Sequence, residues 1–569
     1  MYFCESSSLS DRTKHIINVV SIGPGLCQGD FGMKHRISPS VPFPKLAVNP
    51  AALALAAFLA GLCAMMLAVY ARMFLARLLY PLDLEWMEGG VLVHVQRLVE
   101  ARPLYIAPSV DFIPFAYTPF YYVAVALPAT FLGVSFFLAR LISLLALASI
   151  PVAYLRALRT VESVPGRGLP WFALLAALLG LCLLLLEYFT TGAWLDLARA
   201  DTLFLALTLW GGVVLVGADR GSHGTRAMIV AGVLFSLAFW TKQTAVLFIL
   251  VAGAWQLARD WRRCAILVIT VALLCGGGML LLQWHSDGWA WFYLRRIHQL
   301  HTFDASRAWI KTPMELASRL WPLGIAGLLG ISWSAVSRKR PAAGVLFWWL
   351  FAICGVVTAA VGSGTQWAHI NALLPAAVFL PPAVAASWTG WASSVRSTPD
   401  GDLHLCDAAA TDTRRRLHMA WMLAGFAILL FHLHTRHPGA VEFERATPTA
   451  ADRMAARNFI RTLRRMPGPI LIPYHPWSAV LAGSPPHFHQ HALTDIRGAG
   501  LPVPRDFTAG LRSGRWSTIV HDRHGHTFWR QWPGFTSHYR NTSAVRGRRL
   551  HTWAGNPCGP RTFWTPVTP

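Results

Sequence analysis

Residues 51–80 read AALALAAFLAGLCAMMLAVYARMFLARLLY, and residues 81–90, PLDLEWMEGG, follow them directly. The first stretch exceeds the roughly 20 apolar residues that carry a helix across a bilayer, where a helix satisfies its own backbone hydrogen bonds. The second stretch places three carboxylates, Asp83, Glu85 and Glu88, just beyond the end of that helix. Together the two stretches predict a membrane helix that leads into an acidic loop at one bilayer surface.

The whole chain is apolar enough to form many such helices. Of its 569 residues, 54% are hydrophobic and only 14% are charged, and its mean hydropathy is +0.43. Such a composition requires contact with lipid. We expect an all-α polytopic membrane protein with about 11 to 12 transmembrane helices. The clearest apolar runs are residues 51–80, 117–134, 137–155, 170–189, 202–217, 227–240, 244–258, 264–284, 321–336, 342–361, 370–392 and 418–434.

The charge and the cysteines argue against two other classes of protein. The formal net charge of +23 lies mostly in short arginine clusters between apolar runs and in the last stretch of chain. The membrane body therefore offers no soluble basic domain for nucleic acid. The nine cysteines form no CxxC pair, and several fall inside apolar runs. They are typical of small core residues and not of a disulfide framework or a zinc site.

The basic loops predict the orientation of the chain, because arginine-rich loops stay on the cytoplasmic side. Two apolar runs separate each successive pair of clusters, so the chain after residue 435 should emerge outside the cytoplasm, as should residues 81–116. The region 117–158 must then cross the membrane an odd number of times, although it contains two apolar runs. One of them is expected to be re-entrant or too short to span. The clusters are Arg156, Arg159 and Arg167; Arg220 and Arg226; Arg259, Arg262 and Arg263; Arg338, Lys339 and Arg340; and Arg414, Arg415 and Arg416.

The sequence predicts three regions. Residues 1–46 are polar and irregular, so we expect a disordered segment, and the basic residues after Met33 favour a translation start near that methionine. Residues 47–435 should form the membrane domain. Residues 436–569 are less apolar and should form a small extracytoplasmic α/β region, with a buried strand over 469–473 followed by a turn and a helix over 474–483.

The acidic loop is the first candidate for chemistry. Asp83, Glu85 and Glu88 could supply a general base that takes a proton from an acceptor hydroxyl or amine. They could equally bind a hard divalent cation, since carboxylate oxygens are the ligands that such ions prefer. The structural alternative is that they are solvated charges at the membrane interface.

Charged residues at the membrane boundary are the next candidates. Asp201 begins an apolar run, where an acid is costly unless it is paired or used, and Arg199 is the obvious partner. Lys242 lies between two short apolar runs and could neutralise a phosphate, or its side chain could simply extend to the interface. Asp111 precedes an aromatic entry at Tyr117, where most aromatic residues are expected to form an interfacial belt.

Two further loops are expected on the same outside surface. Residues 285–320 interleave basic and aromatic side chains, a pattern that suits either an amphipathic segment at the interface or a clamp for a lipid phosphate. His369 and Asn371 follow a glycine-rich turn near the same surface, where they could bind substrate or cap the next helix.

Three histidines in the C-terminal region alternate along the chain. His487, His489 and His491 would share one face of a strand and could bind a transition metal. Because no partner ligands follow at a suitable spacing, we expect no metal site there.

In their order along the chain, these stretches resemble the GT-C superfamily of membrane glycosyltransferases, which includes protein mannosyltransferases, lipid A aminoarabinose transferases and many bacterial family 39-like enzymes. In that pattern a helix leads to an acidic loop followed by glycine, a Pro-Tyr-like turn and a Tyr-x-Pro entry to the next helix. The resemblance covers roughly residues 50 to 390, and the ordered series carries it. The matching stretches are Met87-Glu88-Gly89, Arg102-Pro103-Leu104-Tyr105, Tyr117-Thr118-Pro119, Gly133-Val134-Ser135, Ala139-Arg140, Arg199-Ala200-Asp201, Lys242-Gln243 and His369-Ile370-Asn371 with Pro375.

The resemblance implies a multi-pass enzyme of a bacterial inner or plasma membrane, with its active site on the extracytoplasmic side. It implies inverting transfer of a sugar from a polyprenyl phosphate to an envelope lipid, glycan or protein, with no nucleic acid as partner. The family commonly has Asp-Glu where this chain has Met87-Glu88, so Glu88 is the first expected acid and Asp83 or Glu85 are alternatives. Whether a divalent cation takes part is left open, and no metal ligand is named. The implied catalytic residues are Glu88, Asp83, Glu85 and Asp201, and the implied substrate-binding residues are Asp111, Tyr117, Arg199, Lys242, His369 and Asn371.

A transporter or flippase for an anionic or lipid-linked substrate is the alternative. Such a protein would also place charges in the membrane and use a broken helix such as the one at Lys242. Transporters often contain inverted repeats of the helix pattern, and this chain shows none. The acidic loops on one side favour an enzyme.

Overall fold

The computed structural model describes residues 50–161, 170–218, 224–336, 343–396, 408–522, 532, 534–555 and 557–567. The predicted disordered segment 1–46, with the expected start at Met33, lies outside these residues. Residues 55–569 belong to one structural unit, and every contact described below lies within it. The predicted domain boundary between residues 435 and 436 stays a prediction.

Long apolar helices dominate the chain up to residue 436. Among the described residues, seven helical stretches are long and apolar enough to cross a membrane, and three shorter apolar helices accompany them. The all-α polytopic class is confirmed. The helices are α1 (Pro50–Leu78), α2 (Glu88–Val99), α3 (Phe120–Leu132), α4 (Phe136–Arg159), α5 (Pro170–Leu186), α6 (Ala200–Gly217), α7 (Gly224–Thr241), α8 (Ala245–Leu257), α9 (Trp261–Val271) continuing through η2 (Ala272–Gly277) into α10 (Gly278–His285), α13 (Thr312–Val336), α14 (Ala343–Gly364), η5 (Ile370–Leu373) continuing into α15 (Leu374–Arg396), and α16 (Ala408–Arg436).

The region 117–158 contains two helices of different length. Helix α3 has 13 residues with a proline inside it, whereas α4 has 24 residues. At about 1.5 Å per residue, α3 covers only about 20 Å, which is less than the roughly 30 Å of a hydrocarbon core. Gly133, with a φ of 78°, then turns the chain, and Ser135 caps α4 by accepting a hydrogen bond from the Leu138 N–H at 3.2 Å. Helix α3 is therefore the run that is too short to span.

The segment between α10 and α13 is a series of short helices. It comprises α11 (Trp289–Trp291), η3 (Phe292–Arg296), α12 (Ile297–Leu300) and η4 (Arg307–Lys311). Its basic and aromatic side chains alternate in exposure: Trp291 and Trp309 are about half exposed, whereas Tyr293 is buried. The segment is thus amphipathic, as its pattern predicts.

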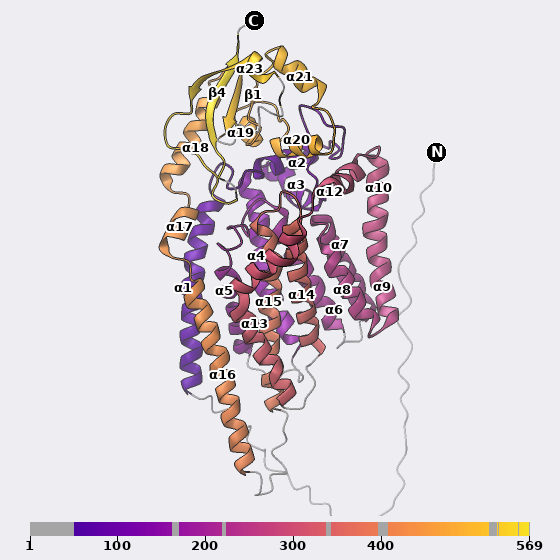
Figure 1. The fold of residues 1–569 in the computed structure, drawn as a ribbon, viewed down its shortest axis with the longest axis vertical. Coiled ribbons are helices and arrows are strands. Elements are labelled where there is room, and N and C mark those ends of the chain that lie inside the picture. Colours follow the sequence, from indigo (N-terminus) through magenta and orange to yellow (C-terminus); the bar gives the residue numbers. More distant parts are fainter. Residues whose placement is uncertain are drawn as a thin grey trace, which may run out of the picture. The chain divides into compact units, whose positions relative to one another are not determined.

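The C-terminal region folds around a four-stranded sheet with the strand order β1-β2-β4-β3. Strand β1 is parallel to β2, and β4 pairs antiparallel with β2 and β3. Strand β1 and helix α19 confirm the predicted strand and helix, and Figure 1 shows the sheet at the end of the helical bundle where α2 and α12 lie. The elements are α17 (Ala440–Ala446), α18 (Ala450–Leu463), β1 (Ile470–Leu471), α19 (Pro476–Leu481), α20 (Gln490–Gly498), α21 (Arg505–Arg512), β2 (Thr518–Asp522), α23 (Phe535–His538), β3 (Tyr539–Ala544) and β4 (Pro560–Pro566).

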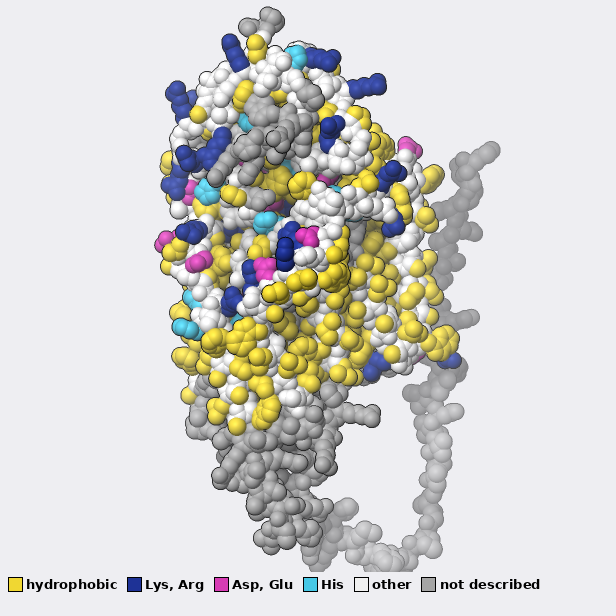
Figure 2. Space-filling view, in the orientation of Figure 1, with side chains coloured by type: hydrophobic (Ala, Val, Ile, Leu, Met, Phe, Trp, Pro, Cys, Tyr) yellow, Lys and Arg dark blue, Asp and Glu magenta, His cyan; other side chains and the backbone are white. Residues whose placement is uncertain are grey.

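The surface of the helical bundle is apolar, as a bilayer requires. Figure 2 shows hydrophobic side chains covering the bundle, while arginine, acidic and histidine side chains gather toward the C-terminal region. The continuous α9–α10 stretch is the most exposed of the candidate spans, since only 6% of its apolar 18-residue segment is buried. Its outward side chains include Leu273, Leu280, Leu281 and Trp284, each more than half exposed.

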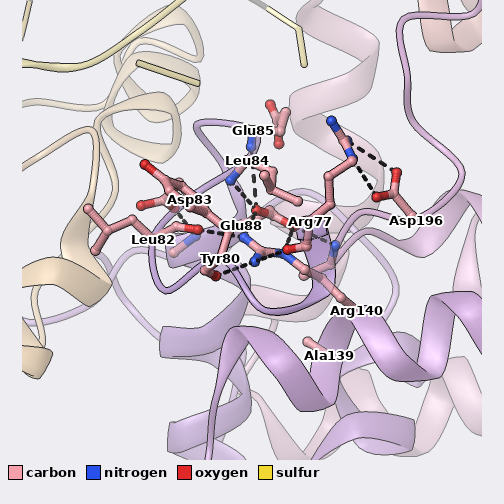
Figure 3. Close-up of polar contacts among 12 residues, drawn as sticks. Arg77, Tyr80, Leu82, Asp83, Leu84, Glu85, Glu88, Ala139, Arg140 and Asp196 are labelled. Atoms are coloured by element: carbon pink, nitrogen blue, oxygen red, sulfur yellow. Dashed lines mark hydrogen bonds and ion pairs between the residues drawn. The ribbon is translucent and has the colours of Figure 1, made fainter. Parts of the chain in front are cut away.

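A buried ion pair fixes the loop 81–90 on this bundle. Glu88 at the start of α2 and Arg140 in the first turns of α4 are both fully buried, and their side chains meet at 2.7 and 3.0 Å. Glu88 also accepts hydrogen bonds from the N–H groups of Leu84 and Ala198 at 2.6 and 2.7 Å (Figure 3). The Arg140 guanidinium donates in addition to the backbone carbonyls of Arg77, Tyr80 and Leu82.

A second buried pair lies beside the first. Arg77, in the last turn of α1, meets Asp196 at 2.5 Å, and Tyr188 donates to the same carboxylate at 2.6 Å. The guanidinium also donates to the carbonyls of Ala193 and Ala446. Arg77 therefore joins α1 to the loop before α6 and to the start of the C-terminal region.

We expect Glu88→Gln to destabilise the fold by about 3–5 kcal/mol, because it leaves the buried Arg140 without a counter-charge. Unfolding of the purified protein in detergent measures this. The matched control is Glu100→Gln, since Glu100 pairs with Arg102 on the surface at 3.3 Å, with the two side chains 33% and 57% exposed. That control should change stability by less than about 1 kcal/mol. Equal effects of the two substitutions would contradict the assignment.

Candidate functional site

A cavity of about 430 Å³ lies where α6, α14 and the break between α7 and α8 meet the loop 81–90 and helix α20. Apolar side chains of the bundle, such as Phe204 and Leu374, line part of it. Polar and aromatic side chains line the rest. The structure brings most of the predicted site residues together in this lining: Glu85, Tyr117, Arg199, Asp201, Lys242, His369 and Asn371.

Glu85 is the acid of the loop that faces this cavity. Its Oε2 accepts a hydrogen bond from the Met87 N–H at 3.1 Å and pairs with Arg199 at 3.2 Å. Its Oε1 is buried and has no hydrogen-bond partner. Burial raises the pKa of Glu85 to about 7, against the opposing effect of Arg199. A carboxylate with one unpartnered oxygen and a near-neutral pKa is suited to accept a proton.

Asp201 and Lys242 form the other charged pair of the cavity. Lys242 Nζ lies 2.5 Å from Asp201 Oδ1, and Asn371 Nδ2 donates to the same oxygen at 3.2 Å. Trp194 Nε1 donates to Asp201 Oδ2 at 3.0 Å. The expected pairing of Asp201 with Arg199 is wrong, because Arg199 turns to Glu85 instead. Lys242 stays about a quarter exposed, so its ammonium remains accessible to a ligand.

Aromatic rings orient the remaining groups. Tyr117 accepts a hydrogen bond from Arg199 at 3.3 Å, and the guanidinium lies over the rings of Tyr117 and Trp194 at 5.5 and 5.6 Å. His369 stacks on Trp194 with ring centroids 5.4 Å apart, and its Nδ1 is buried without a hydrogen-bond partner. Burial lowers the pKa of His369, so the neutral imidazole is favoured.

Three predicted residues lie away from the cavity. Glu88 is enclosed by its pair with Arg140, and burial, which would raise its pKa, is outweighed by that guanidinium, so the pKa is lowered. Asp83 turns toward the C-terminal region. Asp111 is 65% exposed and pairs with Arg515 at 3.0 Å. Each of these three carboxylates is held by a partner that does not line the cavity.

The Asp83 contact links the loop to the C-terminal region. His475, which precedes α19, lies between Asp83 and Asp522, with each ring nitrogen 3.2 Å from a carboxylate oxygen. Burial would lower the pKa of His475, but the two carboxylates raise it to about 10, so the imidazolium is the stable form. Asp83 Oδ1 also accepts the Gly89 N–H at 2.6 Å. A Cβ at Gly89 would meet Asp83 Oδ1 at 2.8 Å, which explains the glycine.

The acidic loop therefore offers no shared set of metal ligands. Its three carboxylates face three different cations, those of His475, Arg199 and Arg140. Among the residues that the structure describes, no group of three or more histidine, cysteine or acidic side chains is arranged to hold a metal ion.

The alternating histidines do not form a strand. His489 caps the N-terminus of α20, and its Nε2 meets the Trp86 carbonyl at 2.9 Å. His487 Nε2 accepts the Ile472 N–H at 3.0 Å. The predicted strand over these residues is wrong, because the side chains bond to separate backbone groups and the chain enters a helix after His489.

The C-terminal region adds cavity residues that the sequence analysis does not single out. Tyr474, Thr494 and Asp495 line the cavity together with His491. His298 of α12 and His301, which follows α12, also line it. The sequence around these α20 residues predicts only an amphipathic helix. A local pattern does not tell which element that helix packs against, so it does not predict a cavity residue.

We expect His475→Gln to weaken the attachment of the C-terminal region in a pH-dependent manner. The folded pKa of His475 is about 10, above the ordinary 6.5, so its stabilisation is fully present below pH 6.5 and is lost as the pH rises toward 10. The difference in thermal midpoint between wild type and variant should therefore shrink from pH 6.5 to 10. A difference that grows over this range would contradict the charged bridge.

No protein-family model matches the chain, and a comparison with curated proteins gives no match. Solved structures do match. The crystal structure of ArnT from Cupriavidus metallidurans bound to undecaprenyl phosphate has a TM-score of 0.53 at 14% identity, covering 89% of this chain and 98% of that one. The apo state of ArnT has a TM-score of 0.50 at 15% identity with the same coverage. The archaeal oligosaccharyltransferase AglB from Archaeoglobus fulgidus reaches 0.43 at 11% identity, covering 81% and 70%.

The coverage by ArnT extends over nearly the whole of both chains, so the similarity includes the C-terminal region as well as the bundle. At this identity the similarity concerns the fold. The predicted polytopic helical architecture is confirmed, and this chain has a fold similar to that of ArnT.

Proposed function

We propose that this protein is a membrane glycosyltransferase that moves a sugar from a polyprenyl phosphate to an extracytoplasmic lipid, glycan or protein. The observation that carries the proposal is Glu85, a cavity carboxylate with an unpartnered buried oxygen and a pKa of about 7. A general base needs such a pKa to be deprotonated in part at neutral pH and still to bind a proton. Glu85 replaces Glu88 as the proposed base.

The proposed reaction is a single inverting displacement. The acceptor hydroxyl or amine attacks the anomeric carbon and gives its proton to Glu85 Oε1, the atom without a partner. The bond between the anomeric carbon and the phosphate oxygen breaks, and its electron pair stays on the phosphate. The phosphodiester monoanion thereby becomes a phosphomonoester that carries one more negative charge.

The cations of the cavity are the proposed phosphate site. Lys242 and Arg199 both line the cavity, and each is held by a carboxylate, Asp201 and Glu85 respectively. Groups held in place before the reaction stabilise the charge of a leaving phosphate without reorganising. The fold supports a lipid-linked donor in this role, because ArnT binds undecaprenyl phosphate. Tyr117, His369 and Asn371 are the proposed positioning residues around these charges.

We expect Glu85→Gln to lower sugar transfer by about 100- to 10,000-fold, the usual contribution of a general base. Transfer is measured as incorporation of labelled sugar from undecaprenyl-phosphate glucose, mannose or arabinose in native membranes, which contain the acceptor. In wild type, kcat/KM should rise with pH through an apparent pKa of about 7, because only the ionised Glu85 accepts a proton.

The matched control is Glu442→Gln, since Glu442 is an exposed acid of α17 outside the cavity. This variant should retain the rate and the pH profile of wild type. A Glu85→Gln variant that folds and keeps the wild-type rate would exclude Glu85 as the base. Persistence of the same pH profile in that variant would exclude it as the titrating group.

We place the proposed site on the extracytoplasmic side, because the turn between α8 and α9, which contains Arg259, lies at the end of the bundle opposite the C-terminal sheet (Figure 1). Arginine-rich turns stay on the cytoplasmic side. A cysteine introduced at the exposed Ser513 should react with a membrane-impermeant maleimide in intact cells. A cysteine in place of the exposed Arg262, in the first turn of α9, should react only after permeabilisation. The reverse labelling would place the cavity on the cytoplasmic side.

A further inference from the structure

One part of the cavity wall has no role in the proposed transfer step. It is formed by His301 after α12, Trp367 in the turn after α14, and His491 and Asp495 of α20. These residues come from three segments that are far apart in the sequence. The C-terminal region and the bundle therefore build this wall together.

The polar groups of the wall are buried and poorly satisfied. Asp495 is 6% exposed, and its Oδ1 has no hydrogen-bond partner. Both ring nitrogens of His301 are also buried without one. The nearest contacts are long: His301 Nε2 and His491 Nε2 each lie 3.5 Å from an oxygen of Asp495. Unsatisfied buried groups are costly, so a ligand that donates to Asp495 and accepts from a histidine would relieve that cost.

Trp367 supplies an aromatic surface beside these groups. Its side chain is 56% exposed although it lines the cavity. Its φ is 66°, a left-handed conformation that is rare for a bulky residue and persists only when the surroundings impose it. Hydrogen bonds between the adjacent Gln366 and Thr302, at 2.9 and 3.0 Å, impose it here. The indole is thus held toward the cavity at a conformational cost.

The chemistry of this wall fits a sugar ring better than a phosphate or a metal ion. Asp495 would repel a phosphate, whereas Lys242 and Arg199 elsewhere in the cavity would attract one. The described residues hold no metal-binding group of histidine, cysteine and acidic side chains. A sugar has hydroxyls that donate to a carboxylate and accept from a ring N–H, and an apolar face that packs on an indole.

We propose that Asp495, His301 and Trp367 form the subsite for the sugar ring of the lipid-linked donor. This inference rests on the proposed function and extends it to substrate specificity. Asp495 and His301 select the sugar by its hydroxyl pattern, and Trp367 packs on its apolar face. The phosphate lies at Lys242, so one donor occupies both subsites.

Equilibrium binding to purified protein in nanodiscs tests this. The probes are undecaprenyl phosphate and its conjugates with glucose, mannose and arabinose. Wild type should bind at least one conjugate more tightly than undecaprenyl phosphate itself. Asp495→Asn should weaken that conjugate about ten- to hundredfold, the range for hydrogen bonds to charged groups. Trp367→Ala should weaken it about two- to tenfold, the range for aromatic packing. Undecaprenyl phosphate should change by less than about twofold in both variants.

Two controls separate the subsites. Lys242→Ala should weaken undecaprenyl phosphate and its conjugates alike, and Glu442→Gln should change neither. Three results would overturn the subsite: unchanged conjugate binding in Asp495→Asn, equal weakening of both kinds of ligand in that variant, or no preference of wild type for any conjugate. If transfer still depends on Glu85 in such a case, the proposed function stands without the subsite. If wild type binds no lipid phosphate at all, both proposals fail.

Discussion

The structure depends on the burial of two guanidinium groups at the upper ends of α1 and α4. A charge in a low-dielectric interior must be paired and fully hydrogen-bonded, so Arg77 and Arg140 dictate what surrounds them. Arg140 takes Glu88 and three backbone carbonyls, and Arg77 takes Asp196 and two more. These bonds fix the loop 81–90 and the loop before α6 as a single rigid layer on top of the bundle.

That layer explains why two neighbouring glutamates have different properties. Glu88 is the anchor, with every oxygen engaged, and its pKa is lowered. Glu85 lies three residues earlier on the same anchored loop, lines the cavity and keeps one oxygen unpartnered. His475 holds the loop from the other side through Asp83. The position of the proposed base is thus determined by bonds that it does not itself make.

The fold could largely be predicted from sequence, and the site only in part. Apolar runs identify membrane helices because a chain in lipid must satisfy its own backbone hydrogen bonds. Which of the two runs in 117–158 fails to span became clear only from the structure, where α3 has 13 residues. The acidic loop and Lys242 also follow from local pattern. The sequence does not reveal which of the two glutamates lines the cavity. Glu85 and Glu88 differ by their partners, Arg199 and Arg140, which are remote in the chain. Asp495 had no signal, since only tertiary packing brings α20 to the cavity.

The shared construction of the cavity has a consequence for biosynthesis. Helix α20, which contributes Asp495 to the cavity, belongs to the last quarter of the chain, while Glu85 and Lys242 belong to the first half. A nascent chain can insert its helices and pair Arg140 with Glu88 before α20 is made, whereas Arg77 gains its bond to Ala446 only with the C-terminal region. The newly inserted bundle therefore remains an incomplete pocket until the final segment has been made and has docked. A premature stop late in the gene would leave a membrane-inserted protein with an unfinished site.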